Sequence, residues 1–476
     1  MQLSDYCNFD GVGLADLIAS GACSIREVTE ASLAAMAAIN PTLNAVIEQY
    51  TDVFDEAKLG DGPLRGVPFL IKDVGEHFGG RLAESGSRLC KGLVAGRNDY
   101  FADLVLASGV NPVGRSNVPE FSMASCACNQ LHGDTSNPWR HGFSTHGSSG
   151  GAAAAVAAGI VPIAHASDIG GSIRAPAAWC GTVGLYPSRG QVSIGPFAGE
   201  HGLGMAQALV VTRTMRDTAL MLDLLGRPMP GDPYVIARPP GTFSSHIHHD
   251  PRSIRVGWSA RPLMDAPVDP EIAAAVEKVA RVLADNGCHV EEAQPDIDLA
   301  LMDEGCKNIW YLGFDSHLDE LGARAGRKVG PDTVSRATLG FYEFAKRQTP
   351  EAYFRTMDDF NRMRRDAARF FSRFDVWLSP TCAQVAQPNG VFGMDIDLPP
   401  DEFLRHEQRV SQFMVPYNVW GQPAISLPLA THSNGLPIGI QLGARHAEEH
   451  LLIALGGFLE QAMPWKDRRP PLHALA

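Results

Sequence analysis

Two serines flanked by glycines are the residues of this chain best suited to nucleophilic chemistry. Ser148 lies in the segment HGSSGG, and Ser172 lies in SDIGGSIR, 24 positions later (172 minus 148). A serine hydroxyl attacks a carbonyl carbon only when a base removes its proton. Gly170 and Gly171 allow the backbone before Ser172 to form a nest of N–H groups, which stabilises the oxyanion produced by such an attack. The pattern predicts Ser172 beside an oxyanion hole.

A lysine at the end of an apolar run is the candidate base. Lys72 directly follows VPFLI (67–71), so we expect a buried strand to carry its amine into the interior. Burial disfavours the charged form of an amine and lowers its pKa, and a neutral lysine can replace histidine as the base for a serine. Alternatively, Lys72 reaches the surface or pairs with Asp73, because lysines are rarely buried.

The residues alone leave three interpretations of the serines open. In the first, GSSGG is a G-x-S-x-G elbow with Ser149 as the nucleophile of a Ser-His-Asp hydrolase, but this elbow needs a preceding strand and HGFSTHG (141–147) is not one. In the second, Lys72, Ser148 and Ser172 act together along a chain of hydrogen bonds. In the third, the loops only pack closely or bind a phosphate, although they match no Walker pattern.

The elements that must position these residues alternate between helix and strand. The run GGAAAAVAAG (150–159) predicts a buried helix because alanine favours helices, and IVPIAHAS (160–167) predicts a strand before the second serine. Near the N-terminus, Ser24 and Glu27 form a capping box for a helix that we expect to end at Asn40-Pro41. The alternation of strands and helices predicts an α/β protein.

Composition and charge exclude several classes of protein. With 45% hydrophobic and 20% charged residues among 476, the chain has enough apolar residues for a large core and is not disordered. The net charge of −13 argues against nucleic acid or an anionic membrane as the main partner. The start, MQLSDYCNFDG, lacks the features of a signal peptide, and no run of about 18 apolar residues occurs. We therefore expect a cytoplasmic protein that binds no membrane.

The cysteines and histidines give no pattern of a disulfide framework or a metal site. The nine cysteines are odd in number and scattered along the chain. Cys126, Cys128 and His132 lie close together in sequence, but three candidate ligands without a fourth favour packing. We expect HIHHD (246–250) on a surface loop and no metal in the protein.

The two serine segments resemble the signature of the amidase signature family. They read GSSGGAAAAVAAG and SDIGGSIRAPAAWCGTVG, and the stretches GVPFLIKD, LHGDTSNPW, PYNVWGQPAISLPL and GLPIGIQLG are similar to the same family in the same order. The resemblance spans about residues 10–465. It implies one large α/β domain with a central mixed, twisted β-sheet flanked by helices on both faces. The expected regions are N-terminal and helical (1–60), the signature core (61–230), a region covering the cleft (231–375) and a C-terminal completion of the sheet (376–476).

The resemblance also implies a role for each candidate residue. Ser172 would be the nucleophile that forms an acyl-enzyme, and Lys72 would be the final base. Ser148, after a cis bond from Gly147, would bridge them. The expected oxyanion hole consists of the backbone N–H groups of Ile169, Gly170, Gly171 and Ser172.

Further residues take weaker assignments from the same resemblance. Ser122 and Met123 match positions with backbone contacts near the scissile bond, and Asn418, Trp420 and Gln441 are candidates for the pocket wall. Asp168 and Arg174 are expected to support the loop of the nucleophile by hydrogen bonds and charge pairing. The chain departs from the family at His146, Ala152 and Tyr186, where Gly, Ser and Lys are common.

The implied function is an amidohydrolase that cleaves C–N bonds of small, fairly apolar linear amides, anilides or carbamates without a metal or a cofactor. One alternative is a nylon-oligomer hydrolase acting on 6-aminohexanoate cyclic dimer. Another is the glutaminase subunit of a tRNA-dependent amidotransferase, although the ending MPWKDRRPPL looks closer to bacterial stand-alone amidases. The expected partners are a small amide and water, and the sequence leaves a homodimer open.

Overall fold

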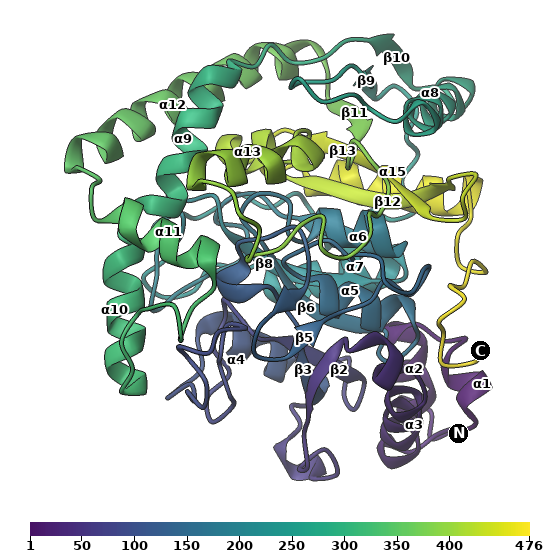
Figure 1. Cartoon of the computed structure of the whole chain (residues 1–476). Coiled ribbons are helices and arrows are strands. Elements are labelled where there is room, and N and C mark those ends of the chain that lie inside the picture. Colours follow the sequence, from purple (N-terminus) through teal and green to yellow (C-terminus); the bar gives the residue numbers. More distant parts are fainter.

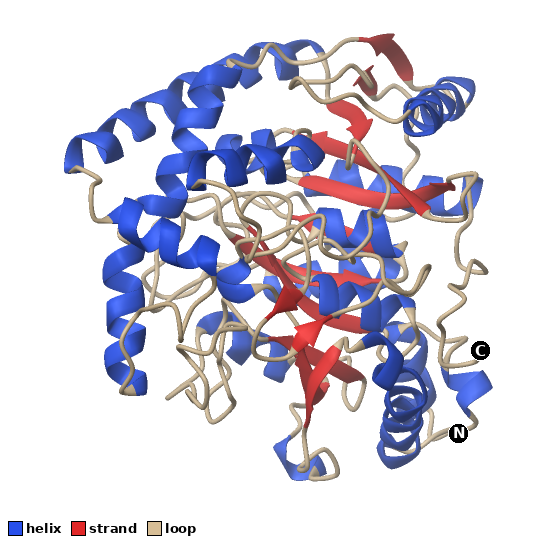
Figure 2. Ribbon diagram, viewed as in Figure 1, coloured by secondary structure: helices blue, strands red, loops and turns tan.

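An 11-stranded mixed sheet runs through the middle of the molecule, with helices on its sides (Figure 2). The structure is a computed structural model that describes residues 1–476. The strand order is β1-β3-β2-β6-β8-β7-β12-β13-β11-β9-β10. The strands are β1 (Val46–Gln49), β2 (Pro68–Lys72), β3 (Asn111–Ser116), β6 (Ile163–Asp168), β7 (Val183–Tyr186), β8 (Gln207–Thr212), β9 (Arg255–Trp258), β10 (His289–Glu292), β11 (Val376–Pro380), β12 (Ala424–Thr431) and β13 (Pro437–Ala444), while β4 (Cys128–Asn129) and β5 (Gly133–Asp134) form a separate pair.

Fifteen α-helices and three short 3-10 helices surround the sheet. The α-helices are α1 (Leu3–Tyr6), α2 (Gly11–Ala19), α3 (Ile25–Leu43), α4 (Tyr100–Ala107), α5 (Gly150–Ala157), α6 (Arg174–Cys180), α7 (Met215–Leu225), α8 (Pro270–Asp285), α9 (Leu299–Tyr311), α10 (Phe314–Ala325), α11 (Arg336–Ala345), α12 (Pro350–Arg373), α13 (Pro400–Ser411), α14 (Val415–Trp420) and α15 (Glu449–Ala462). The 3-10 helices are η1 (Glu56–Lys58), η2 (Glu120–Ser122) and η3 (Phe243–His246).

The sheet combines parallel and antiparallel pairs. Strand β2 is parallel to both of its neighbours, β3 and β6, and β9 is parallel to β10 and β11. From β6 to β11 the neighbouring strands are antiparallel. In Figure 1 the sheet extends from β2 and β3 at the bottom to β9 and β10 at the top. Because parallel strands end at the same edge, the ends of β2 and β6 lie together, which is where the candidate residues fall.

Strand β13 shows that helices cover both faces of the sheet. A side chain at Gly439 would overlap Ala178 of α6, and one at Gly443 would overlap Tyr417 of α14. Residues alternate between faces along a strand, so Ile440 points to the other side, where α8 and α15 pack against β13. These contacts confirm the expected α/β sheet flanked on both faces.

Helices α9 to α13 gather at one side of the sheet (Figure 1). Helix α9 packs against α11, α12 and α13. A second apolar cluster, separate from the main core, joins this helical region to the sheet through residues such as Phe360, Trp377 and Trp420.

The N-terminal helix α3 differs from the expectation at its end. The capping box of Ser24 and Glu27 is present, but the helix continues through Pro41 to Leu43. The helix ends at Asn44, which has a left-handed backbone conformation and donates its N–H to Asn40 O. The prediction of an end at Asn40-Pro41 was wrong because one proline within the last turns removes a hydrogen bond without preventing the final turn.

Two global features bear on the expected partners. The helices of the structure all fall short of the length and apolarity that crossing a bilayer demands. No group of three or more His, Cys, Asp or Glu side chains is placed to share a metal ion, and Cys126, Cys128 and His132 are included in that finding.

Candidate active site

Strand β2 delivers Lys72 to a buried position at its end. The side chain is 2% exposed, and its Nζ donates to Ser148 Oγ at 2.8 Å, to Ser167 Oγ at 2.8 Å and to Ser167 O at 3.2 Å. Asp73 forms its ion pair with Arg115 instead. Of the two expectations for Lys72, the buried position is therefore the one found, and pairing with Asp73 is not.

Burial also sets the charge state of Lys72. It lowers the pKa of the amine to about 7, although the nearby charges of Glu76 and Asp168 raise it. A lysine with this pKa is substantially neutral near pH 7, so it can accept a proton.

A buried glutamate–histidine pair lies behind Lys72. His165 Nδ1 accepts the backbone N–H of Lys72 at 3.2 Å, so the ring carries its proton on Nε2, which lies 2.7 Å from Glu76 Oε2. Burial raises the pKa of Glu76, but the hydrogen bond and charge of His165 and the charge of Lys72 outweigh it, so the pKa is lowered overall. Glu76 is thus an anion near the candidate base. The sequence analysis did not identify either residue of this pair.

The two serine loops meet through their backbones. The N–H of Ser149 donates to the carbonyl oxygen of Ser172 at 3.2 Å. The bond between Gly147 and Ser148 is cis, as the resemblance implied, and a side chain at Gly147 would overlap the carbonyl oxygen of Ala124. Ser149 Oγ donates to Ser167 O at 3.3 Å and has no histidine partner. The interpretation of Ser149 as the nucleophile of a Ser-His-Asp hydrolase therefore has no support in the structure.

The loop before Ser172 offers three free backbone donors rather than four. The N–H groups of Ile169, Gly170 and Ser172 donate to no acceptor in the protein. The N–H of Gly171 instead donates to Asp168 Oδ1 at 2.7 Å. Gly171 is thus a correction to the expected oxyanion hole, because the carboxylate that fixes the loop already uses its N–H.

Asp168 and Arg174 join this loop to the opposite end of the chain. Asp168 accepts from Arg174 Nε at 3.0 Å and from Asn418 Nδ2 at 2.8 Å. Arg174 also donates to Asn418 Oδ1 at 2.6 Å, to Gln441 Oε1 at 3.0 Å and to Met414 O at 2.9 Å. Burial raises the pKa of Asp168, but the charge and hydrogen bonds of Arg174 and Asn418 lower it further, so the carboxyl is ionised.

The same network corrects the expectation for Asn418. Its side chain is fully buried and bonded to Asp168, Arg174 and Met205 O, and it does not line the pocket described below. Gln441 has a similar place behind the loop, and Trp420 belongs to the second apolar cluster. Both amide side chains are used to anchor Arg174, because a buried guanidinium needs acceptors around its whole edge.

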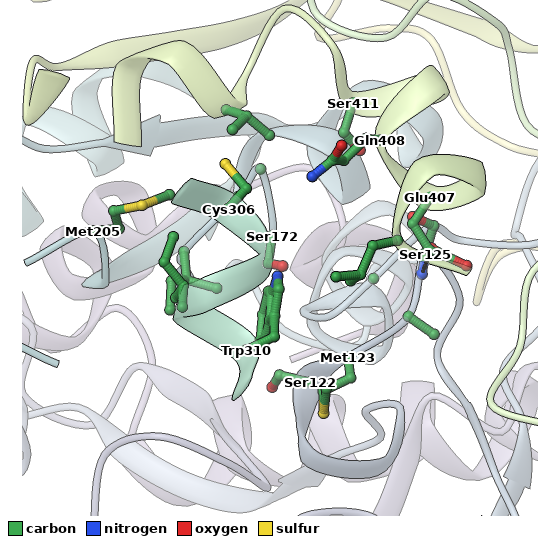
Figure 3. Close-up of a pocket in the computed structure, with 18 of the residues that line it drawn as sticks. Ser122, Met123, Ser125, Ser172, Met205, Cys306, Trp310, Glu407, Gln408 and Ser411 are labelled. Carbon is green, nitrogen blue, oxygen red and sulfur yellow. Dashed lines mark hydrogen bonds between the residues drawn. The ribbon is translucent and has the colours of Figure 1, made fainter. Parts of the chain in front are cut away.

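Ser172 opens into a pocket of about 640 Å³, measured to its open mouth. Ser122 and Met123 line this pocket, as expected, and the backbone of Ser122 has a positive φ of 63°. In Figure 3, Ser172 lies between Met205 and Cys306 on one side and Glu407 on the other. The residues that sequence reasoning missed come from two helices: Cys306, Ile309 and Trp310 from α9, and Leu404, Glu407, Gln408 and Ser411 from α13.

The sequence matches the amidase family over residues 27–453. The chain belongs to the amidase signature family. It is 34% identical over 478 residues to the 6-aminohexanoate-cyclic-dimer hydrolase of Paenarthrobacter ureafaciens, which covers 97% of this chain and 96% of the relative. It is 33% identical over 468 residues to an acylamidase of Rhodococcus erythropolis, with 96% of each chain covered. Membership makes this chain a hydrolase that acts on amide bonds.

A solved structure of 6-aminohexanoate cyclic dimer hydrolase shares the fold of this amidase. The TM-score is 0.93 at 33% identity, with 98% of this chain and 99% of the other covered. The similarity confirms the expected single domain of the amidase signature type with a large mixed sheet.

Two departures of this amidase from the family lie close to the serine loops. His146 lines the pocket, with its ring packed edge-on against Trp179 at 4.6 Å between centroids. Burial lowers the pKa of His146 to about 4, so its ring is neutral. Tyr186 is fully buried and donates its hydroxyl to Met205 O at 2.8 Å, behind the pocket wall. Only His146 can therefore touch a substrate directly.

The periodicity of α9 and α13 was the available signal for the missed residues. Positions 306, 309 and 310, and positions 404, 407, 408 and 411, have the spacing of one helix face. That spacing is equally typical of a face packed in a core, so it could not separate the two roles. Ser167 could have been found from the parallel pairing of β2 and β6, which brings the ends of the two strands together.

Proposed function

We propose that this amidase hydrolyses small, fairly apolar amides through an acyl-enzyme, with Ser172 as nucleophile, Ser148 as bridge and Lys72 as base. The observation that carries the proposal is the 2.8 Å contact between Lys72 Nζ and Ser148 Oγ in a buried site where the pKa of the lysine is about 7. A neutral amine beside a serine is the arrangement that activates a hydroxyl without histidine.

In the first step Ser172 Oγ attacks the carbonyl carbon of the amide. The proton of Ser172 passes to Ser148, and the proton of Ser148 passes to the neutral Nζ of Lys72. The negative charge that develops on the carbonyl oxygen is stabilised by the free N–H groups of Ile169, Gly170 and Ser172. The structure shows no hydrogen bond from Ser172 Oγ, so the hydroxyl turns toward Ser148 before the attack.

In the second step the C–N bond breaks. The proton on Lys72 returns through Ser148 to the departing nitrogen, which leaves as an amine, and Ser172 remains as an acyl ester. A water molecule then attacks the ester with the same proton relay and releases the carboxylic acid. Each cycle consumes one water and restores the neutral lysine.

The composition of the pocket supports small, largely apolar substrates. Its wall includes Met123, Met205, Ile309, Leu404 and Val415, and its volume fits a compact molecule. The same dimensions leave linear amides, anilides and carbamates as candidates.

Hydrolysis of 6-aminohexanoate cyclic dimer is a second candidate function. The similarity to the relative that bears this activity in its name extends over nearly the whole chain, with a TM-score of 0.93. No comparable observation on this chain favours the third alternative, a glutaminase subunit that depends on tRNA.

A substrate panel with four proteins tests the proposal. Wild type, Ser172→Ala, Lys72→Met and the control Lys278→Met would be assayed on 4-nitroacetanilide, an aryl carbamate, 6-aminohexanoate cyclic dimer and glutamine. We expect hydrolysis of an anilide or the cyclic dimer by the isolated wild type, and a loss of at least about 10³-fold in kcat for the first two variants. Lys278 is on the exposed surface of α8, so its replacement should have no effect.

Three results would contradict the proposal. One is glutaminase activity that needs a second protein and tRNA. Another is labelling of a residue other than Ser172 by an acylating probe, identified by mass spectrometry. The third is a loss of activity on replacement of a single histidine that equals the loss for Lys72→Met.

A further inference from the structure

Glu407 is a carboxylate in the wall of the pocket that the proposed mechanism does not use. It lies on α13, on the same helix face as Leu404, Gln408 and Ser411, and all four line the pocket. Its side chain is 8% exposed. Figure 3 shows Glu407 next to Ser125, on the opposite side of Ser172 from Met205 and Cys306.

Only one of its two oxygens has a partner in the protein. Oε2 accepts the backbone N–H of Ser125 at 2.5 Å. Oε1 is buried and accepts no hydrogen bond from the protein. A buried acceptor without a donor costs free energy, and the cost is larger when the acceptor is charged. The free oxygen therefore needs a donor that comes from a ligand or from solvent.

The charge of Glu407 also has no counterpart in the protein. Glu407 forms no ion pair with any lysine, arginine or histidine. It is the only acidic or basic residue of the pocket wall apart from His146, whose ring is neutral because burial lowers its pKa to about 4. Burial raises the pKa of Glu407 to about 7, although the hydrogen bonds of Ser125 lower it. A cation in the pocket would stabilise the ionised carboxylate.

The rest of the pocket suits a cation attached to a hydrocarbon. Met205, Cys306 and Ile309 form an apolar wall on the far side of Ser172. Trp310 also lines the pocket, and an indole ring attracts an ammonium group.

We propose that Glu407 is a specificity-determining residue that binds a protonated primary amine of the substrate. The preferred substrate is then an amide in which a short hydrocarbon segment joins the scissile group to an ammonium group. The inference rests on the proposed function for the chemistry at Ser172, but the binding of the ammonium group can be measured without catalysis.

The binding experiment compares a cation with a neutral donor of the same length. Isothermal titration of wild type, Glu407→Gln and Glu402→Gln would use hexylamine at neutral pH, where it is protonated, and 1-hexanol. Glu402 lies on the same helix but is exposed, so its variant is the matched control. We expect wild type and Glu402→Gln to bind hexylammonium at least about tenfold more tightly than hexanol, and Glu407→Gln to lose this preference.

Equal affinities of wild type for the two ligands would overturn the inference, and this comparison does not depend on the folding of any variant. A preference that persists in Glu407→Gln would overturn it as well. Binding of hexanol with the same dependence on Glu407 would mean that the carboxyl group recognises a neutral donor rather than a cation.

A kinetic experiment relates the binding to substrate choice. Two matched pairs place the amine on either side of the scissile bond: 6-aminohexanoyl against hexanoyl 4-nitroanilide, and N-(6-aminohexyl) against N-hexyl benzamide. We expect Glu407→Gln to lower kcat/KM about tenfold or more for the amine-bearing member of one pair and less than about threefold for its neutral partner.

The two proposals fail in different ways. A structural role of Glu407 would lower kcat/KM equally for both members of each pair, which would overturn the inference and leave the proposed function standing. Hydrolysis of no amide, together with ammonium binding that depends on Glu407, would overturn the proposed function and support the binding site.

Discussion

The protonation of Lys72 depends on opposing effects of a few residues. Burial lowers its pKa to about 7, while the anions of Glu76 and Asp168 raise it. Only the neutral amine accepts a proton, so kcat/KM of wild type should be low below pH 7 and should rise through about pH 7 to a plateau. The acid limb of the pH profile therefore reports on the charges around one amine.

Glu76→Gln tests this assignment. Glutamine has the shape of glutamate and can still accept the N–H of His165, but it lacks the charge that raises the pKa of Lys72. We expect the acid limb to move to lower pH, with a rise of roughly 3- to 10-fold in kcat/KM at pH 6 relative to the plateau. The measurement is kcat/KM from pH 5 to pH 9, with Glu30→Gln on the exposed face of α3 as control. A shift to higher pH would mean that Lys72 is not the titrating base.

At the scale of elements, a single arginine connects the nucleophile loop to the C-terminal part of the sheet. Arg174 opens α6 and reaches the loop after β6 through Asp168, the region of α14 through Met414 O, and β13 through Gln441. Both members of the ion pair are fully buried. The position of the loop thus depends on an interaction between elements that are far apart along the chain.

Arg174→Met should destabilise the protein by roughly 3–5 kcal/mol, because it leaves the carboxylate of Asp168 buried without its cation. It should also slow the labelling of Ser172 by an acylating probe, since the loop loses its anchor. Denaturant unfolding and labelling rates measure the two effects. The double variant Asp168→Asn/Arg174→Met should recover part of the lost stability, because no unpaired charge stays buried. A double variant whose loss equals the sum of the two single losses would contradict this account.

On the scale of the whole molecule, two apolar clusters have different relations to the pocket. The main core fills the space around the sheet, whereas the second cluster supports α9, which provides Cys306, Ile309 and Trp310 to the pocket wall. Phe360 of α12 packs closely against α9 at Gly305. Packing far from Ser172 should therefore affect the binding of substrate.

Phe360→Ala should cost about 3–5 kcal/mol in stability and raise KM severalfold, because the cavity lets α9 shift. The rate at which a small acylating probe labels Ser172 should stay within about twofold of wild type, since the catalytic loops pack elsewhere. Phe243→Ala, in the main core at η3, is the matched control and should lower stability by a similar amount without changing KM. Equal changes of KM in the two variants would show that the second cluster has no special role.

The sequence by itself determined the features that depend on neighbouring residues. The apolar run before Lys72 predicted a buried strand, the alanines after Ser149 predicted a buried helix, and both were found. Local physical chemistry sufficed there, because helix propensity, apolar patterning and glycine conformations act within a few positions. The two serine motifs were also specific enough to predict the family.

Only the tertiary structure decided which atoms remain free to act on a substrate. It showed that the N–H of Gly171 is occupied by Asp168 and that Asn418 lies behind the loop rather than in the pocket. The pocket wall depends on distant contacts, such as that between Ser125 and Glu407, which are 282 positions apart. Such contacts arise when the whole chain packs, and no local pattern encodes them.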